Sequence, residues 1–361
     1  MMINNFENIF KIKANIEDVR DEINSIPKGK YLCVQANSNE VIYIPHEEFY
    51  KLVSKAKSKP MINMHEDIEI GLGGSALTEK SIIKPDFSDL MKFLVEKINI
   101  VFENDNDEMI ISSSEGIILE LPWEDVSDKK IIVFREVISN KRKSFEEKTN
   151  NLLFVVSHAV KHGGEILEPI KEKMDEEIKS IYSLIGSLKT QEMPTHFKLQ
   201  NVLLSIHTTK DSFKNTQWEK YNYVHFIMHG LDTGEICLEN SDDHELVDPL
   251  SASDFLSILN GKNFELFFLS FCYSCGGVNT GESLAFKIID EGISKYVIGY
   301  SYPVKGGPAL LFATDFYDRF LNGDKDIQGN DRIKDFYKKS LLKCYNKNNI
   351  RNYVPFLYMY T

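Results

Sequence analysis

Residues 223–230 read YVHFIMHG, and residues 264–272 read FELFFLSFC. Each stretch is an apolar run of strand length that closes on a polar, reactive side chain, His229 in the first and Cys272 in the second. A loop rich in Gly, Asp and Asn and one helical segment, 253–259, separate the runs, so a strand–helix–strand unit makes them parallel neighbours. Because active sites of open α/β sheets gather at the carboxyl ends of strands, we predict that His229 and Cys272 share one edge of a sheet.

The same alternation of apolar strands and amphipathic helices continues on both sides of these runs. It predicts an α/β fold in which a mostly parallel sheet is flanked by helices. We expect helices at 86–98, 166–188, 253–259, 283–291 and 308–321, and strands at 109–112, 116–120, 131–134, 152–157, 201–206, 223–228, 264–271 and 296–300.

Residues 1–70 predict a small α+β N-terminal domain ahead of the larger one at 71–361. Strands are expected at 30–35 and 40–44, and helices at 16–26 and 46–56. Residues 1–70 contain no group of side chains that suggests a catalytic site. Regulation, docking of a partner and plain packing against the larger domain are therefore the alternative roles of this unit.

Composition and charge argue against several classes of protein. The formal net charge of −12 and the pI near 5.3 disfavour direct nucleic-acid binding, because such surfaces neutralise phosphates with Lys and Arg. No signal peptide is evident, nor an apolar run of about 18 residues that would span a membrane. Five cysteines are a sparse, odd number for a disulfide-stapled fold, so we expect a cytoplasmic protein with reduced thiols.

An imidazole beside a thiol is a pair suited to nucleophilic catalysis. The imidazolium lowers the pKa of the thiol, and it can donate a proton to a departing amine. Gly230 lets its backbone N–H approach a substrate closely, and with the amide of Cys272 it could form an oxyanion hole. On spacing alone, ordinary loop residues are an equally good interpretation of His229 and Cys272. The chemistry requires no metal and no organic cofactor.

Ordered segments carry a resemblance to a known family. Residues 224–230 match a His-Phe-x-x-His-Gly strand, residues 269–272 match Leu-Ser-Ala-Cys except at Phe271, and residues 121–124 contain Pro-Trp-Glu. In this order they resemble the CHAT family of caspase-like cysteine peptidases, whose clan includes caspases and separases. The similarity covers roughly residues 76–361 and extends to segments at 281–286, 292–299, 316–317 and 353–359.

The resemblance implies a caspase-like fold with a degenerate first part, 71–200, and a catalytic part, 201–361. It implies an endopeptidase that uses a His229/Cys272 dyad on a specific protein substrate, under the control of the N-terminal domain or of an activating subunit. A role in bacterial stress response or antiviral defence is implied in the same way. The competing hypothesis is a catalytically silent, caspase-like adaptor, which the unusual residues 273–275 after the cysteine keep open.

Three further residues are candidates for roles near this pair. Ser301 and Tyr302 are expected to contact substrate, because this region resembles the part of the family's substrate cleft that pairs, strand to strand, with an extended peptide. A simple β-to-α loop is the alternative. Cys275 forms a Cys-x-x-Cys with Cys272 and is interpreted as a redox modulator of the nucleophile. A metal site at these cysteines would need further ligands that the pattern does not supply, so we predict none.

Other polar residues near strand ends are left out of the site. His225 is interpreted as a hydrogen-bonded core histidine, because strand alternation directs it into the protein. His158, His162 and His207 are interpreted as incidental loop histidines. Three acidic residues are interpreted either as an acidic substrate pocket or as a solvated loop: Asp232, Glu235 and Glu239.

Overall fold

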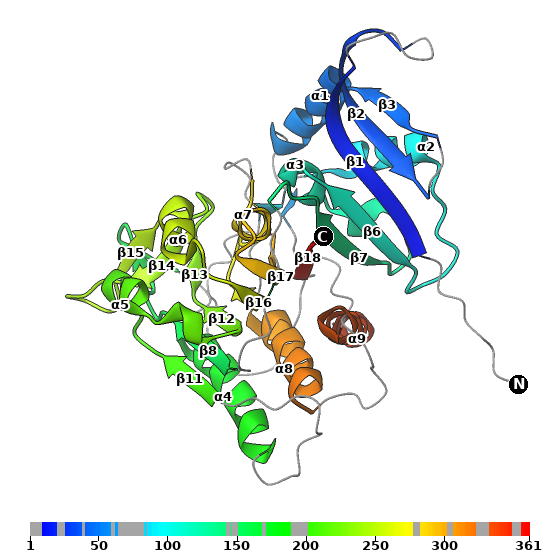
Figure 1. Ribbon diagram of the computed structural model, residues 1–361. Coiled ribbons are helices and arrows are strands. Elements are labelled where there is room, and N and C mark those ends of the chain that lie inside the picture. The colour runs from blue at the N-terminus through cyan, green and yellow to red at the C-terminus, as the bar shows by residue number, and fades with distance from the viewer. Residues whose placement is uncertain are drawn as a thin grey trace, which may run out of the picture.

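The computed structural model describes residues 9–19, 26–37, 40–58, 62–63, 83–84, 86–141, 145, 151–167, 171–188, 201–276, 282–301, 306–322, 332–348 and 355–361. One 11-stranded sheet runs through this part of the chain (Figure 1). Its strands are, from one edge to the other, β11 (Asn201–Ser205), β8 (Asn151–Val156), β12 (Tyr223–Ile227), β16 (Phe264–Ser270), β17 (Ser294–Tyr300), β18 (Pro355–Tyr360), β7 (Ile132–Val137), β6 (Glu108–Ser113), β1 (Ile9–Val19), β2 (Gly29–Ala36) and β3 (Ile42–Pro45).

Most of the sheet consists of two parallel groups that meet at β18, and β2 and β3 add an antiparallel edge beyond β1. Strands β11, β8, β12, β16 and β17 are parallel to one another, whereas β18 pairs antiparallel with β17 and parallel with β7. Strands β7, β6 and β1 continue in the direction of β18, so the carboxyl ends of the two groups lie on opposite edges. The predicted α/β fold with a mostly parallel sheet is thus confirmed.

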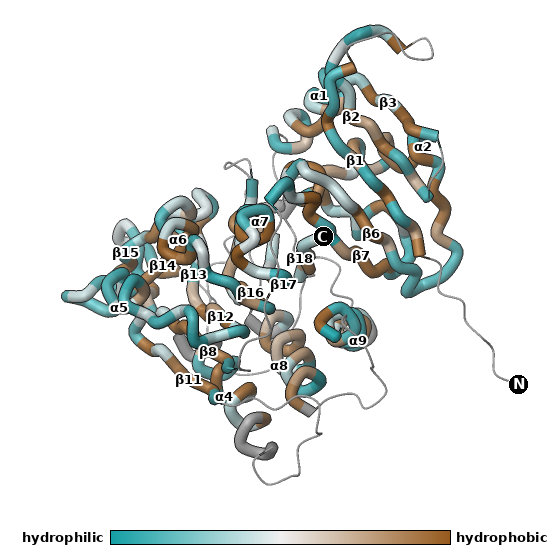
Figure 2. Tube along the Cα trace, in the orientation of Figure 1, coloured by the Kyte–Doolittle hydropathy of each residue, from teal (hydrophilic) through white to brown (hydrophobic). Residues whose placement is uncertain are grey.

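Helices cover both faces because the strands bury alternate residues on opposite sides. In β12, Val224 and Phe226 belong to one apolar cluster, and Tyr223 and Ile227 belong to the other. Figure 2 shows the apolar residues that gather along the strands and on the inner sides of the helices. The first cluster includes residues of α1 (His46–Ser58), α2 (Ser88–Ile98), α6 (Ala252–Leu259) and α7 (Leu284–Asp290), and the second includes residues of α4 (Lys171–Leu188), α8 (Gly306–Asn322) and α9 (Arg332–Asn348).

None of the described helices is both long enough and apolar enough to cross a membrane.

Two predicted elements are wrong. Residues 16–19 of the predicted helix 16–26 belong to β1, which pairs with β2 on one side and with β6 on the other; residues 20–25 lie outside the described part of the chain. The predicted strand 116–120 contains instead the short helix α3 (Gly116–Leu119). Its apolar run, Ile-Ile-Leu, is compatible with either structure, because short apolar runs do not distinguish a strand from a buried helical turn.

The N-terminal strands extend the main sheet and do not form a sheet of their own. Ile12 of β1 lies opposite Ile111 of β6, and both side chains are buried in the same cluster. The small α+β unit is therefore continuous with the sheet through this parallel pair. Its separation as a domain at residue 70 stays a prediction.

The Pro-Trp-Glu segment, residues 122–124, contacts the main sheet through a buried ion pair. Glu124, in a short 3-10 helix (Trp123–Val126), accepts two hydrogen bonds of 2.8 Å from the guanidinium of Arg135 on β7. Arg135 is fully buried and lies 3.4 Å from the ring centre of Phe356 on β18. The ion pair thus stands where the two parallel groups of strands join.

Candidate active site

His229 is held outside the main sheet by a small antiparallel sheet. After β12 ends, β13 (His229–Gly230) pairs with β14 (Ile236–Glu239), which pairs in turn with β15 (Val247–Leu250). His229 lies opposite Cys237 and is only 4% exposed. These pairs fix the backbone from which the imidazole projects. The sequence predicts a loop over this segment, and that prediction is wrong for the residues of β13, β14 and β15.

Cys272 lies in a tight turn two residues beyond the end of β16. The next residue, Tyr273, has a φ of 60°, in the left-handed region that residues other than glycine seldom adopt. The hydroxyl of Ser274 stabilises the turn: it accepts from the backbone N–H of Tyr300 at 2.9 Å and donates to the carbonyl of Phe271 at 3.0 Å. The turn thereby holds Cys272, which is 8% exposed, at the end of its strand.

The two segments meet at Gly230. The parallel register pairs Ile227 with Ser270, so His229 and Cys272 each lie two residues beyond the last pair of neighbouring strands. A Cβ atom at Gly230 would lie 2.2 Å from the carbonyl oxygen of Cys272 and 2.8 Å from the ring of Phe271, so only glycine fits there. His229 and Cys272 therefore occupy the same edge of the sheet, as predicted, whereas their catalytic roles and the oxyanion hole at Gly230 stay predictions.

A second thiol, that of Cys237, borders this pair. Cys237 is fully buried, and burial raises its pKa to about 12, with a further contribution from the charge of Cys272. Burial likewise raises the pKa of Tyr273 to about 12, with smaller contributions from Cys272 and then Asp232. Both groups therefore stay protonated at neutral pH, so a thiolate at Cys272 would face protonated neighbours.

Cys275 is packed away from this edge. A Cβ atom at Gly299 of β17 would lie 2.7 Å from its sulfur, and the Cys275 side chain is fully buried in the apolar cluster opposite to that of Cys272. Burial raises the pKa of the Cys275 thiol well above its usual range, which disfavours a reactive thiolate. This packing favours a structural role over that of a redox modulator, which stays a prediction.

Ser301 joins the turn after the candidate nucleophile to the end of β17. Its hydroxyl donates to the carbonyl oxygen of Cys275 at 3.3 Å, and it is 4% exposed. Tyr302 lies outside the described residues. Contact of either residue with a substrate stays a prediction.

A buried carboxylate under the site was missed by sequence reasoning. Glu177 of α4 accepts a hydrogen bond of 3.0 Å from the hydroxyl of Ser270, two residues before Cys272. Its carboxylate also lies 3.2 Å from Nε2 of His225, a fully buried histidine, so the core position predicted for His225 is confirmed. In the sequence, Glu177 is one of many charges along a helix and gives no separate indication.

A second group of polar residues lies on the same edge. The ligand atoms of His158, His207 and Glu239 are within 4.8 Å of one another, which makes them a group that could hold a metal ion.

No family model matches the sequence, and no curated protein matches it. Among solved structures, the chain is similar to the Saccharomyces cerevisiae separase–securin complex, with a TM-score of 0.41 and 13% identity over 76% of this chain and 17% of that one. It is also similar to the Arg-specific cysteine proteinase gingipain R (RgpB), with a TM-score of 0.41 and 10% identity over 75% of this chain and 66% of that one. The chain spans less than two thirds of either protein, and these weak likenesses concern the general fold alone.

Proposed function

We propose that this chain is a caspase-like cysteine endopeptidase in which Cys272 is the nucleophile and His229 the general acid and base. The observation that supports this most is the close approach of Gly230 to the backbone of Cys272. It joins the ends of two neighbouring parallel strands, one bearing an imidazole and the other a thiol. The pairing suits thiol catalysis, because the nucleophile and the proton carrier must work on the same carbonyl group.

In the proposed reaction, the thiol of Cys272 gives its proton to His229, and the sulfur forms a bond to the carbonyl carbon of the peptide while the π electrons of the C=O bond move to the oxygen. The backbone N–H groups of Gly230 and Cys272 stabilise the oxyanion of the tetrahedral intermediate. The C–N bond then breaks, and the imidazolium of His229 gives its proton to the leaving amine. Water, deprotonated by His229, hydrolyses the thioester and releases the acid product, which restores the thiol and the imidazole.

Burial of both residues supports a regulated form of this activity. His229 is 4% exposed and Cys272 is 8% exposed, so a peptide reaches the sulfur only after the surrounding loops move. We propose that an activating protein subunit, or the N-terminal strands that extend the same sheet, controls this opening. The same burial also favours the second candidate, a silent adaptor that uses the fold to dock partners.

An electrophilic peptide probe separates the two candidates. In an active peptidase the probe labels Cys272 much faster than the other cysteines. Labelling is lost in Cys272→Ala and slowed in His229→Ala, while the control Cys344→Ala, a buried cysteine of α9, leaves the rate unchanged. Slow labelling spread evenly over the cysteines, with and without cell extract as a source of activator, would support the adaptor instead.

The substrate class that we propose is a specific protein partner, cut in the cytoplasm. A role in bacterial stress or antiviral defence rests on the resemblance to the CHAT family. Proteome-wide mapping of new N-termini, in cells that carry the intact chain or Cys272→Ala, would identify the cut proteins. Identical fragment sets in the two strains would contradict the proposal.

A further inference from the structure

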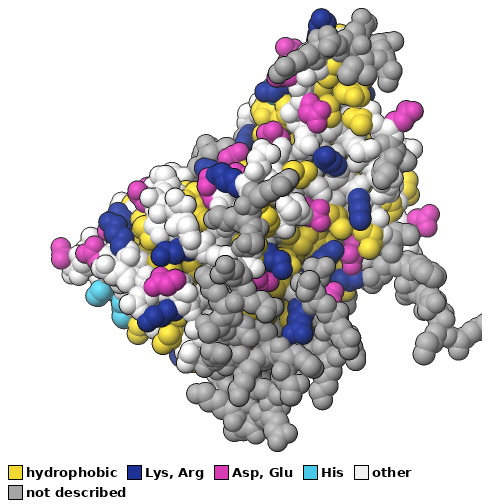
Figure 3. All heavy atoms as spheres, viewed as in Figure 1, with side chains coloured by type: hydrophobic (Ala, Val, Ile, Leu, Met, Phe, Trp, Pro, Cys, Tyr) yellow, Lys and Arg dark blue, Asp and Glu magenta, His cyan; other side chains and the backbone are white. Residues whose placement is uncertain are grey.

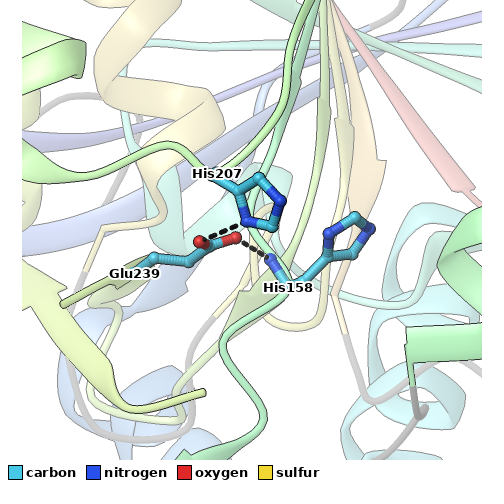
Figure 4. A group of neighbouring side chains, drawn as sticks. All are labelled: His158, His207 and Glu239. Atoms are coloured by element: carbon cyan, nitrogen blue, oxygen red, sulfur yellow. Dashed lines mark hydrogen bonds and ion pairs between the residues drawn. The ribbon is translucent and has the colours of Figure 1, made fainter. Parts of the chain in front are cut away.

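Two loops and one strand of the small sheet that holds His229 bring histidine and glutamate side chains together. His158 follows β8, His207 follows β11, and Glu239 is the last residue of β14. Figure 4 shows the two imidazole rings and the carboxylate grouped at this point, with the dashed contacts converging on Glu239. One ligand atom from each residue lies within 4.8 Å of the others.

The carboxylate of Glu239 is fully buried, so its interpretation as part of a solvated loop is wrong, whereas a contribution to an acidic substrate pocket stays a prediction. One oxygen accepts the backbone N–H of His158 at 2.7 Å. The other lies 2.9 Å from Nδ1 of His207 and 2.8 Å from Nδ1 of His244. Within the described part of the chain, the ion pairs of Glu239 are with these imidazoles. A buried carboxylate requires such compensation, and a bound cation supplies more of it than a neutral imidazole.

The backbone is shaped to bring these groups together. His207 has a φ of 56°, in the left-handed region, and this strained residue turns its side chain toward Glu239. The backbone N–H of Glu239 donates to the carbonyl of Thr208 at 2.9 Å, which ties the loop after β11 to β14. The strain is therefore located at the residue that contributes an imidazole.

A carboxylate outside the cluster contacts one of its rings. Nε2 of His158 lies 3.1 Å from Oδ1 of Asp175 on α4. Histidine ligands of metals ordinarily donate their second ring nitrogen to such a carboxylate, which fixes the ring and raises its basicity. Nδ1 of His158 would then be the atom that serves the metal.

We propose that His158, His207 and Glu239, with His244 as the fourth ligand, bind one Zn²⁺ ion. Three nitrogen ligands and one oxygen ligand match the preference of zinc for tetrahedral sites. Zinc–nitrogen bonds of about 2.0–2.1 Å require ligand atoms about 3.3 Å apart. The Glu239–His207 and Glu239–His244 pairs, now 2.9 Å and 2.8 Å, must therefore open slightly, while the wider spacings of the group, up to 4.8 Å, must close. His207 and His244 have room to adjust, because their side chains are 46% and 54% exposed. Figure 3 shows histidine side chains at the surface over this part of the molecule.

The position of the site defines its role. Glu239 lies two residues from Cys237, which pairs with His229 across β13 and β14. A closed site with four protein ligands is structural, so the ion would clamp the loops after β8 and β11 to the hairpin that carries His229. The proposal does not depend on peptidase activity, since binding is measured directly.

The test uses untagged full-length protein, stripped with a chelator, in a Cys237→Ala/Cys272→Ala background that removes thiol ligands near His229. Zn²⁺ is added in equilibrium dialysis with elemental analysis, and Co²⁺ is added to record visible absorption. We expect one equivalent bound and a tetrahedral Co²⁺ spectrum. His207→Ala and His244→Ala weaken binding more than tenfold, and Asp175→Asn weakens it by about tenfold. The matched control is His162→Ala, an exposed histidine of β9 (Lys161–His162).

His207 and His244 are exposed, so replacing either one leaves the hydrophobic core intact. These variants therefore test metal binding in a folded chain. Absence of a stoichiometric ion at micromolar Zn²⁺ would overturn the proposal. Equal binding by His207→Ala, His244→Ala and the His162→Ala control would overturn it too.

Discussion

Substitution of Gly230 by alanine tests the contact on which the candidate site depends. The added Cβ would lie 2.2 Å from the carbonyl oxygen of Cys272, whereas ordinary contacts begin near 3.4 Å, so the two segments must separate by roughly 1 Å. A misplacement of about 1 Å between reacting groups costs on the order of a hundredfold in rate. Overpacking of this kind also lowers the free energy of unfolding by about 1–3 kcal/mol.

The measured quantities are the second-order rate constant for labelling of Cys272 by a peptide electrophile and the free energy of unfolding in urea. We expect Gly230→Ala to remain folded and to lose about a hundredfold in labelling rate. Gly29→Ala is the matched control, because its Cβ would first meet the ring of Tyr31 at an ordinary 3.4 Å. Labelling of Gly230→Ala at the rate of the unsubstituted protein would refute the inference that this contact sets the geometry of the dyad.

Three other predictions concern charge and burial. Glu124→Gln leaves the buried Arg135 guanidinium without its carboxylate and should lower the free energy of unfolding by about 3–5 kcal/mol in urea titrations; a loss below 1 kcal/mol would contradict this. Burial raises the pKa of Glu120 from 4.5 to about 8, so the folded chain binds this proton more tightly than the unfolded chain. Its contribution to stability is full below pH 4.5 and is lost as the pH rises to about 8, by at most about 1.4 kcal/mol per pH unit; Glu120→Gln should flatten that slope. Cys275→Ser should leave peroxide inactivation unchanged, because burial keeps that thiol protonated, and escape of this variant from inactivation would instead support a redox modulator.

The sequence allowed the centre of the fold to be predicted, but less of its edges. Strands β12 and β16 are buried on both faces, so they appear as continuous apolar runs. Strand β1 alternates exposed and buried residues over 11–14 but not near its end, where Ile16 and Val19 mimic a helical spacing. Pairing with β2 and β6 decides its structure. Strands β13 to β15 are two to four residues long and contain Gly and Pro, so tertiary pairing and not local preference forms them.

The candidate site, like the fold, could be predicted only in part from the sequence. His229 and Cys272 could be predicted to lie together, because each follows an apolar strand and the two strands are parallel neighbours. The neighbours of this pair could not be predicted. Cys237 lies on a hairpin and Glu177 on a helix, and neither residue stands in a sequence motif that marks it as part of the site. The grouping of His158 with His207 was equally hidden, because it depends on which two of several strand ends lie side by side.

The central position of β18 has a consequence for synthesis of the protein. Residues 355–360 are the last described strand to leave the ribosome, yet they lie between β17 and β7, where the two parallel groups meet. During translation, each group therefore waits with an open strand edge, and such edges invite pairing with other chains. A chain cut short before residue 355 would keep both edges permanently open, so a stop codon that removes β18 should yield aggregates and not a shorter working protein.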